Sequence, residues 1–350
     1  MMRERENLVR KIKDADGSTF DQIALEVFRF QARYNSIYAE FLQLLRVDAA
    51  SIDQLTEIPA LPISCFKQHR LRTGSWQETQ IFTSSGTSKT QTSQHLLRSE
   101  SWYTYHTKRA FEAQYGSLQS YAILALLPAY LERRGSSLVF MVQDFIQASG
   151  HKASGFYLYN QEELIGQLES LSEQGQKFLL LGVSFALIDL AEALSKSPIE
   201  IPAGSIIMET GGMKGRRKEM TRKELHQAIS SGFVQTSDQT DGETPRREPA
   251  IIHSEYGMTE LLSQAYAPSD GRFWPGPSLR VLCRELTDPF KLRDHGKTGA
   301  INCIDLANLD TISFIATDDL GRTYADGSFE VLGRMDYSDT RGCNLLYSPV

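Results

Sequence analysis

The sequence predicts an α/β fold, in which a mostly parallel sheet is flanked by helices and a smaller antiparallel β subdomain is built onto it. Two patterns carry this prediction. Between residues 121 and 254 short apolar segments alternate with helical ones, an order typical of a parallel sheet with helices on its faces. Beyond Arg272 the chain changes to short strands separated by Gly and Asp turns, which indicates antiparallel pairing.

The first part of the chain is expected to be helical. Apolar residues recur at helical spacing from Phe20 to Leu44, which predicts one or two amphipathic helices. Residues 79–83 are expected to form a short strand that leads into a hydroxyl-rich loop, and residues 98–115 a helix. We therefore expect three regions: an N-terminal helical segment packed on the main domain (1–75), a core (76–332) and a short C-terminal tail (333–350).

The alternating region supplies most of the expected sheet. Its strands are expected at residues 121–127, 137–142, 177–183, 205–209 and 250–254, and its helices at 161–174, 185–194 and 216–229. The antiparallel strands are expected at residues 279–283, 300–305, 313–316 and 329–332. Because crossovers between parallel strands place helices on the faces of the sheet, a ligand is expected beyond the carboxyl ends of the strands.

The composition is that of a globular protein. Of the 350 residues 41% are hydrophobic and 23% are charged, which leaves enough apolar side chains for a sizeable core. The formal net charge of -6 argues against a nucleic-acid partner, because such binding usually needs a basic face. Apolar runs stay shorter than the roughly 18 residues of a membrane span, and the charged N-terminus is unlike an export signal. We therefore expect no membrane span and a cytoplasmic location.

A hydroxyl-rich loop is the most distinctive segment of the sequence. It consists of Thr83, Ser84, Ser85, Gly86, Thr87, Ser88 and Lys89. Hydroxyls and backbone N–H groups donate hydrogen bonds to phosphate oxygens, a glycine lets the backbone approach closely, and a lysine adds a mobile positive charge. The loop does not fit the Walker pattern of nucleotide hydrolases, and a plain polar surface loop stays an alternative at this point.

Two of the expected parallel strands end in unusual residues. These are Gly211 and Gly212 after the strand at 205–209, and Tyr256, Gly257, Thr259 and Glu260 after the strand at 250–254. Paired glycines let a flat group lie against the backbone, an aromatic ring offers a stacking face, and a carboxylate is a hard ligand for Mg²⁺. Taken singly, such residues more often form a turn, a packing ring and a helix N-terminal charge.

A third stretch adds an acid and a base. Asp319 follows the strand expected at 313–316, and Arg334 follows the strand expected at 329–332. A carboxylate that leaves a strand can accept both hydroxyls of a ribose, and an arginine can complement the sugar or a phosphate. The alternative is an acidic turn between antiparallel strands.

In this order, the motifs resemble those of the adenylate-forming superfamily of acyl-CoA synthetases, adenylation domains and luciferases. The strongest match is Tyr-Gly-Met-Thr-Glu at residues 256–260. The other matching segments are the phosphate loop at 83–89, the adenine segment at 210–212, the ribose motif at 317–319 and the Gly-Arg-x-Asp hinge at 333–336. The resemblance implies ATP and Mg²⁺ as cofactors, with Glu260 on the metal and Lys89 on the phosphates.

Two departures from that superfamily stand out. Asp318 replaces the usual glycine of the ribose motif. Only fourteen residues follow Asp336, so we expect the C-terminal lid domain, with the lysine that assists adenylation, to be truncated.

Two further segments narrow the resemblance. Leu-Pro-Ile-Ser-Cys-Phe-Lys at 61–67 and Arg-Gly-Cys-Asn-Leu-Leu at 341–346 are similar to the acyl-protein synthetase family (LuxE type), the long-chain-fatty-acid protein ligases. In that family a carboxylic acid is activated with ATP, and its acyl group moves to a cysteine near the carboxyl terminus. The resemblance implies a fatty acid here. Cys343 matches that cysteine. The resemblance implies delivery of the acyl group to a partner, an acyl reductase or acyltransferase.

The remaining candidate side chains are cysteines and a histidine. Cys343 is the candidate nucleophile because the thiolate is the reactive form of cysteine. The other cysteines are expected to be structural, and the wide spacing of all four supports neither a zinc site nor a disulfide framework. His253, directly before the Tyr-Gly-Met-Thr-Glu turn, is expected either to assist acyl transfer or to cap the turn.

Two other functions stay open from the sequence. An acyl- or aryl-CoA ligase-like enzyme would use a free or carrier thiol as the acceptor. An inactive subunit of a reductase complex would bind acyl groups or nucleotide without chemistry. The nearly complete set of motifs favours an active enzyme.

Overall fold

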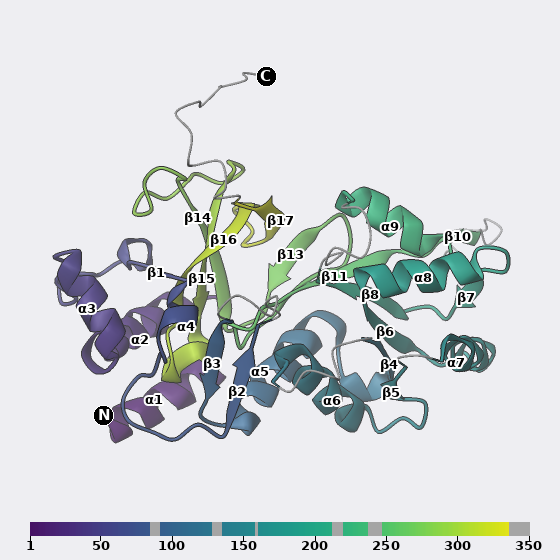
Figure 1. Cartoon of the computed structure of the whole chain (residues 1–350), viewed down its shortest axis with the longest axis horizontal. Coiled ribbons are helices and arrows are strands. Elements are labelled where there is room, and N and C mark those ends of the chain that lie inside the picture. Colours follow the sequence, from purple (N-terminus) through teal and green to yellow (C-terminus); the bar gives the residue numbers. More distant parts are fainter. Residues whose placement is uncertain (85–91, 128–134, 158–159, 212–219, 237–246, 336–350) are drawn as a thin grey trace, which may run out of the picture.

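The computed structural model describes residues 1–84, 92–127, 135–157, 160–211, 220–236 and 247–335 (Figure 1). The helices are α1 (Met2–Lys13), α2 (Phe20–Tyr34), α3 (Ser36–Leu44), α4 (Cys65–Gln68), α5 (Glu100–Tyr115), α6 (Ser137–Ser149), α7 (Gln161–Glu173), α8 (Ser184–Leu194) and α9 (Arg222–Ser230), with short 3-10 helices η1 (Leu55–Glu57), η2 (Leu118–Ser120) and η3 (Leu306–Asp310). The strands are β1 (Leu61–Pro62), β2 (Gln80–Thr83), β3 (Gln94–Leu97), β4 (Ala122–Leu126), β5 (Gly155–Phe156), β6 (Phe178–Val183), β7 (Ile199–Ile201), β8 (Ile206–Thr210), β9 (Phe233–Thr236), β10 (Arg247–Pro249), β11 (Ile252–Tyr256), β12 (Ala265–Ala267), β13 (Arg272–Pro275), β14 (Leu279–Arg284), β15 (Gly299–Asp305), β16 (Phe314–Thr323) and β17 (Phe329–Arg334).

One sheet runs through the described part of the chain. Its strand order is β14-β15-β16-β17-β13-β12-β11-β8-β6-β4-β5, with β1 paired to β16. Neighbours from β5 to β11 are parallel, and those from β11 to β14 are antiparallel. The predicted α/β class is therefore confirmed, and the antiparallel part is hydrogen-bonded to the parallel part through β11 and β12. A three-stranded sheet (β10-β9-β7) and the β2–β3 hairpin stand apart from it.

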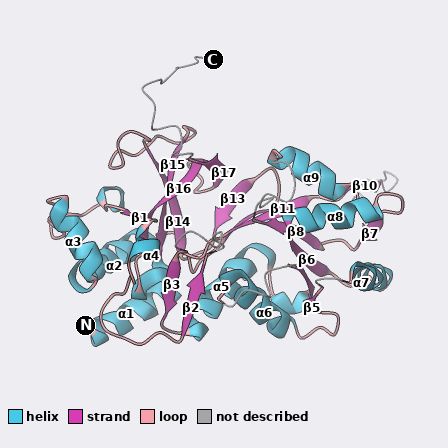
Figure 2. Ribbon diagram, in the orientation of Figure 1, coloured by secondary structure: helices cyan, strands magenta, loops and turns pink. Residues whose placement is uncertain are grey.

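Helices cover both sides of the parallel strands. α5 and α6 contact β12 and β4, whereas α8 and α9 contact β6, β8 and β11, and Figure 2 shows the two pairs on opposite sides of the strands. All six residues of β6 are buried, as expected for a strand covered on both faces. At Gly182 a Cβ atom would lie 2.8 Å from Leu187 Cγ, so the glycine lets α8 approach the sheet.

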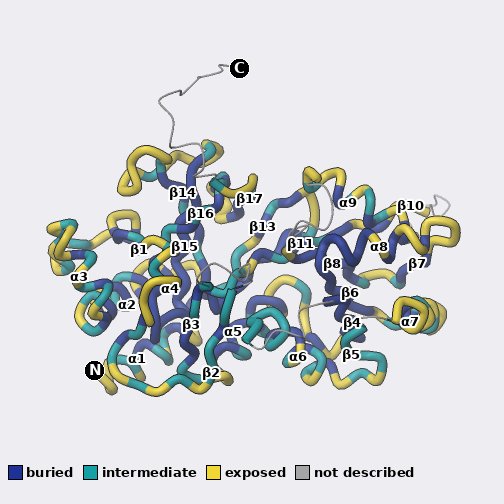
Figure 3. Tube along the Cα trace, viewed as in Figure 1, coloured by how far each residue is buried: buried dark blue, intermediate teal, exposed yellow. Residues whose placement is uncertain are grey.

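The N-terminal helices pack on the antiparallel part of the sheet. The Phe28 ring meets the Phe314 ring of β16 edge-on at 5.9 Å, and the Tyr38 ring stacks on the same ring at 6.2 Å. The three rings are fully buried, and the tube of Figure 3 shows this region as continuous with the buried strands. The N-terminal helices therefore share one core with the sheet.

One element was predicted wrongly. Residues 137–142 form the first half of α6 and not a strand. The Ser136 hydroxyl accepts a hydrogen bond from Val139 N, and Gly150 ends the helix with a left-handed φ of 64°. A short apolar run is compatible with a strand or with a buried helix, and the capping residues on both sides favour the helix.

Other differences concern bounds. β16 continues to Thr323 because its residues alternate between buried and partly buried positions along the whole strand. α9 begins at Arg222, where Thr221 and Glu224 form a capping box, and residues 212–219 lie outside the described residues. The helices α1 and α4 and the short strands β3, β5, β7, β9, β10, β12 and β13 were not predicted. None of the described helices combines the length and the apolar character that a membrane crossing requires.

Candidate active site

The β2–β3 hairpin carries the start of the hydroxyl-rich loop. Thr83 is the last residue of β2, and its backbone N–H donates to Gly135 O at 2.8 Å. The Ser84 hydroxyl accepts a hydrogen bond from Ser93 N at 3.0 Å and so closes the base of the loop. The other predicted phosphate-binding residues lie outside the described residues, namely Ser85, Gly86, Thr87, Ser88 and Lys89.

Tyr256, Asp319 and Arg334 form one connected group. The Tyr256 hydroxyl donates to Asp319 Oδ2 at 2.9 Å, and Arg334 Nε donates to Asp319 Oδ1 at 3.3 Å. Asp319 and Arg334 are also register partners in the β16–β17 pair, so the backbone fixes their separation. The Arg334 side chain is 78% exposed, whereas Asp319 is buried. Three predicted residues from three different strands therefore meet at one place.

Glu260 joins this group from the turn after β11. Its side chain is buried, and burial raises the pKa of its carboxyl group, while the Ser93 hydroxyl, the backbone, Arg334 and Lys67 act in the opposite direction. Ser93 and Arg334 both act on the pKa of Glu260, while Ser93 N bonds the Ser84 hydroxyl and Arg334 Nε bonds Asp319. The electrostatic surroundings of Glu260 therefore include a residue of the hairpin and a residue of the Tyr256–Asp319–Arg334 group.

Glu260 suits Mg²⁺ held chiefly by phosphate oxygens. Mg²⁺ is usually bound by one or two carboxylates together with substrate phosphates, and not by an all-protein cage. Across the described ranges there is no group of three or more His, Cys, Asp or Glu side chains that could hold a metal ion. A single buried carboxyl group beside hydroxyl-bearing residues therefore fits a metal that arrives with its phosphates.

A second pair of carboxyl groups lies at the ends of β8 and β11. The Ser184 hydroxyl donates to Glu209 Oε2 at 3.2 Å and to Gly211 O at 2.9 Å, so the first predicted adenine glycine is fixed through its carbonyl. The Thr210 hydroxyl donates to Glu255 Oε2. Burial raises the pKa of Glu255 to about 7, and the nearby Glu209 adds to the rise. Gly212 lies outside the described residues.

Gly257 and Thr259 complete the turn. Gly257 is exposed, and a Cβ atom there would collide with Glu255 Oε1. The absence of a side chain at Gly257 therefore leaves room for the Glu255 carboxyl group. The Thr259 carbonyl accepts a hydrogen bond from His95 Nδ1 at 2.8 Å.

His253 and a second histidine, His106, have hydrogen-bond partners outside the Tyr256–Asp319–Arg334 group. His253 Nδ1 lies 3.1 Å from the Tyr115 hydroxyl of α5, and burial together with His226 lowers the pKa of His253 to about 4. His106 is buried on α5 with its Nδ1 at 2.8 Å from the Ser278 hydroxyl. Both rings are therefore neutral near pH 7, and His253 has a hydrogen-bond partner on α5.

The described cysteines have the character of buried thiols. Burial raises the pKa of Cys283 to about 11, raises that of Cys303 further, and also raises that of Cys65. Thiols with raised pKa values carry little thiolate at neutral pH. Cys343 lies outside the described residues.

The sequence analysis did not identify three residues that act on Glu260 or on the turn that carries it. Ser93 and His95 follow the hydroxyl-rich loop, and Lys67 lies in α4, yet each acts on Glu260 or on its turn. Lys67 belongs to the segment 61–67, which resembles the LuxE family, so a role for Lys67 could have been inferred from the sequence. A lone histidine in a short strand has no such signal.

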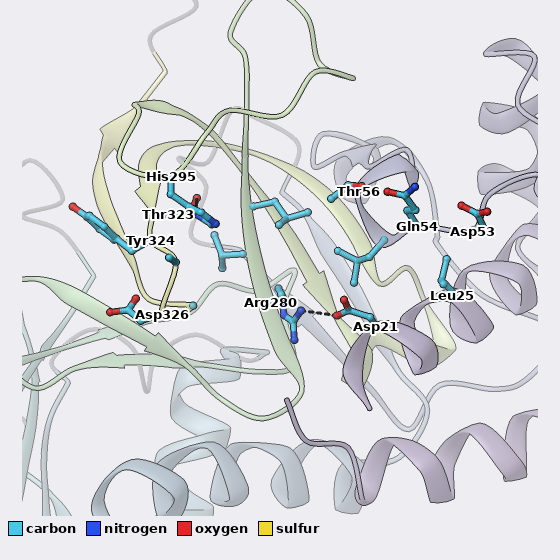
Figure 4. Close-up of a pocket in the computed structure, with 15 residues that line it drawn as sticks. Asp21, Leu25, Asp53, Gln54, Thr56, Arg280, His295, Thr323, Tyr324 and Asp326 are labelled. Carbon is cyan, nitrogen blue, oxygen red and sulfur yellow. Dashed lines mark hydrogen bonds and ion pairs between the residues drawn. The ribbon is translucent and has the colours of Figure 1, made fainter. Parts of the chain in front are cut away.

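A surface pocket among the described residues lies elsewhere. It has a volume of about 670 Å³ and is lined by parts of α2, η1, β14 and β16, including Asp21, Arg280 and Tyr324 (Figure 4). Arg280 forms an ion pair with Asp21 across it. None of the predicted site residues lines this pocket, so it is separate from the group around Glu260.

Comparisons with known proteins concern the family resemblance and the fold. Residues 10–101 match the family model described as "Acyl-protein synthetase, LuxE". No curated protein matches the chain. Among solved structures, a long-chain-fatty-acid-CoA ligase (FadD1) from Archaeoglobus fulgidus is similar at 15% identity and a TM-score of 0.52, covering 73% of this chain and 51% of that one. An ATP-bound RpMatB-BxBclM chimera is similar at 15% identity and a TM-score of 0.50, covering 73% and 47%.

This chain spans about half the length of those two structures. At such low identity the likeness shows the fold alone. The chain has the fold of adenylate-forming acyl-CoA ligases, and its resemblance to the acyl-protein synthetases, LuxE, is confirmed over residues 10–101.

Proposed function

We propose that this protein activates a carboxylic acid with ATP to an acyl adenylate and then transfers the acyl group to its own Cys343. The observation that carries the proposal is the hydrogen-bonded group of Tyr256, Asp319 and Arg334, which come from three strands. Glu260 lies in the turn after Tyr256, and its pKa responds to Arg334 and to Ser93, whose backbone N–H bonds Ser84. The ATP-bound structure with this fold and the fatty-acid ligase with this fold support it.

In the first step a carboxylate oxygen of the acid attacks the α-phosphorus of ATP, and the bond to pyrophosphate breaks. Two anions must approach each other, so the protein acts mainly by positioning them and by neutralising charge. Ser84 and the loop as far as Lys89 hold the outer phosphates, Glu260 holds Mg²⁺, and Arg334 complements the sugar or a phosphate. Tyr256 with Gly211 and Gly212 holds the adenine, and Asp319 holds the ribose.

In the second step the Cys343 thiolate attacks the carbonyl carbon of the acyl adenylate. A thioester forms, the bond to AMP breaks, and AMP leaves with the electron pair. His253 assists this transfer in the proposal. The acid is a fatty acid, the thioester passes to an acyl reductase or acyltransferase partner, and the reaction takes place in the cytoplasm.

The first step is tested by ATP–pyrophosphate exchange with a series of carboxylic acids. Exchange that depends on one class of acid is the expected result. Absence of exchange with every acid would favour an inactive acyl- or nucleotide-binding subunit.

The second step is tested with radiolabelled acid and ATP. Cys343→Ser should abolish covalent labelling and leave exchange intact, whereas Cys65→Ser, at a half-buried thiol, should keep both. The likeness to a CoA ligase makes a free thiol acceptor the second candidate. Labelling that persists in Cys343→Ser would discard the acylation of Cys343, and thioester formation only when CoA is added would support that second candidate.

A further inference from the structure

His95 is a fully buried imidazole with a partner on each ring nitrogen. Nδ1 lies 2.8 Å from the Thr259 carbonyl oxygen, and Nε2 lies 2.9 Å from the Thr311 hydroxyl. A carbonyl oxygen only accepts, so Nδ1 carries the hydrogen, and Nε2 accepts from the Thr311 hydroxyl. The Phe66 ring meets the imidazole at 5.2 Å and closes it off from solvent. The tautomer of His95 is thus fixed by its neighbours.

The bond to Thr259 is one of several that hold the turn around Glu260. Asn308 Nδ2 donates to the Glu260 carbonyl at 2.8 Å, and Asp305 Oδ2 accepts from Leu262 N at 2.8 Å and from Ser263 N at 2.9 Å. Asp305 and Asn308 belong to β15 and η3, which lie behind the turn. His95 is different because it comes from the phosphate-loop hairpin.

The position of His95 in that hairpin matters. It is the register partner of Phe82, next to Thr83, and it follows Ser93 by two residues. The same arm of the hairpin therefore carries Ser93, which bonds Ser84 at the base of the loop, and His95, which bonds the turn of Glu260. A shift of the hairpin relative to the turn would stretch the His95–Thr259 bond.

We propose that His95 is a positioning residue that holds the Glu260 turn in register with the β2–β3 hairpin, so that the Glu260 carboxyl group and the Ser84 hydroxyl bind one Mg²⁺–ATP together. The inference rests on the proposed function and adds a residue outside its motifs. Misplacing a group by about 1 Å can cost about 10²-fold in rate, which sets the size of the expected effect.

The test compares His95→Asn with His95→Gln. The Asn carboxamide N–H takes the place of Nδ1–H and can donate to Thr259 O, whereas the longer Gln side chain reaches the place of Nε2 and leaves Thr259 O without a donor. In ATP–pyrophosphate exchange, His95→Gln should raise the Mg²⁺ concentration for half-maximal rate about 10-fold or more, and His95→Asn less than about 3-fold. The KM for the acid should change little in either variant.

His106→Gln is the matched control. This histidine of α5 is also buried, and its partner is the Ser278 hydroxyl, directly before β14 and not in the Glu260 turn. Its replacement should lower the melting temperature without changing the Mg²⁺ requirement. Should His95→Gln fail to fold, His95→Met takes its place, because it fills the apolar contact with Phe66 but has no N–H donor.

An unchanged Mg²⁺ requirement in folded His95→Gln or His95→Met would overturn the proposal. It would also be overturned if the Mg²⁺ requirement rose equally in the Asn and Gln variants and in proportion to their losses of stability. If the wild type catalyses no exchange, the proposed function fails, and calorimetric binding of MgATP replaces the readout. Weaker MgATP binding by the Gln variant than by the Asn variant would then still support the role of His95, and equal binding would overturn it.

Discussion

The Tyr256 hydroxyl donates a 2.9 Å hydrogen bond to Asp319 Oδ2, which ties the end of β11 to the middle of β16. The Tyr256 ring is packed edge-on against Phe273 at 5.9 Å and Phe329 at 5.4 Å. Burial raises the pKa of Tyr256 well above its usual range, so the phenol keeps its proton and acts as a donor. The carboxylate proposed to bind ribose is thereby held in a fixed orientation.

Tyr256→Phe should weaken both folding and nucleotide binding. The change leaves one oxygen of a buried carboxylate without its donor, and a hydrogen bond to a charged group is worth about 1.5–3 kcal/mol. We expect the free energy of unfolding in urea to fall by that amount and the KM for MgATP to rise. Tyr105→Phe, which removes an exposed hydrogen bond to Lys13 O, is the control and should change neither. Equal losses in the two variants would contradict the role given to Tyr256.

Arg334→Gln should separate binding from stability. The Arg334 side chain is 78% exposed, and exposed ion pairs contribute about 0–1 kcal/mol, so thermal unfolding should hardly change. If Arg334 complements the phosphate or sugar, exchange should nevertheless fall by about 10²-fold or more, as when one electrostatic contact to the transition state is removed. Exchange close to that of the wild type would remove Arg334 from the site.

Glu260→Gln tests the metal ligand. The amide keeps the shape of the side chain but binds Mg²⁺ more weakly than a carboxylate, so exchange should fall by about 10²–10³-fold. Burial raises the pKa of Glu260, which means that the charged form is costly in the folded protein. Stability in urea should therefore be retained or increased, in contrast to Tyr256→Phe. A stability loss in proportion to the loss of exchange would indicate a structural role.

The motif residues were predictable because their chemistry shows in the sequence. Tyr256 ends β11 and Glu260 lies in the turn after it, where parallel sheets place their ligands, and the fold class followed from the alternation of apolar and helical segments. Asp319 was expected after a strand, but it lies in the middle of β16. The contacts between them were not predictable, because pairs such as Tyr256 and Asp319 depend on how the antiparallel strands continue the sheet.

His95 and α6 illustrate two reasons for failure. His95 acts through one long-range hydrogen bond to the backbone carbonyl of Thr259. Because any residue has such a carbonyl, the residue type at position 259 does not reveal the bond. The apolar start of α6 has no clear periodicity over six residues, so only the caps at Ser136 and Gly150 distinguish helix from strand.

Gln31→Leu should show that the N-terminal helices support the site. Gln31 is fully buried, its Nε2 donates to Asn308 O and Leu309 O at 3.1 Å, and its Oε1 accepts from Ser313 N at 3.0 Å. Leucine would remove the partner of Ser313 N and of Leu309 O, whereas Asn308 O would keep its bond from Thr311 N, and we expect a cost of about 2–4 kcal/mol in the free energy of unfolding. Because Asn308 also holds the Glu260 carbonyl, exchange in the folded variant should show a raised Mg²⁺ requirement.

Gln22→Leu is the control for that change, since Gln22 lies on the exposed side of the same helix. It should alter the free energy of unfolding by no more than about 0.5 kcal/mol. A comparable loss in both variants would mean that the buried amide has no special role.

Glu255→Gln should change how stability depends on pH. Burial raises the pKa of Glu255 to about 7, so between about pH 4.5 and pH 7 the folded state holds more protons than the unfolded state. The free energy of unfolding of the wild type therefore falls as the pH rises through this window, and glutamine removes that loss. In urea titrations, the stability of Glu255→Gln relative to the wild type should rise from about pH 4.5 to pH 7 and then level off. Glu169→Gln, at an exposed residue of α7, is the control and should show no such trend. If the stability difference between Glu255→Gln and the wild type did not change with pH, the Glu255 carboxyl group would be ionised in the folded protein across this pH window.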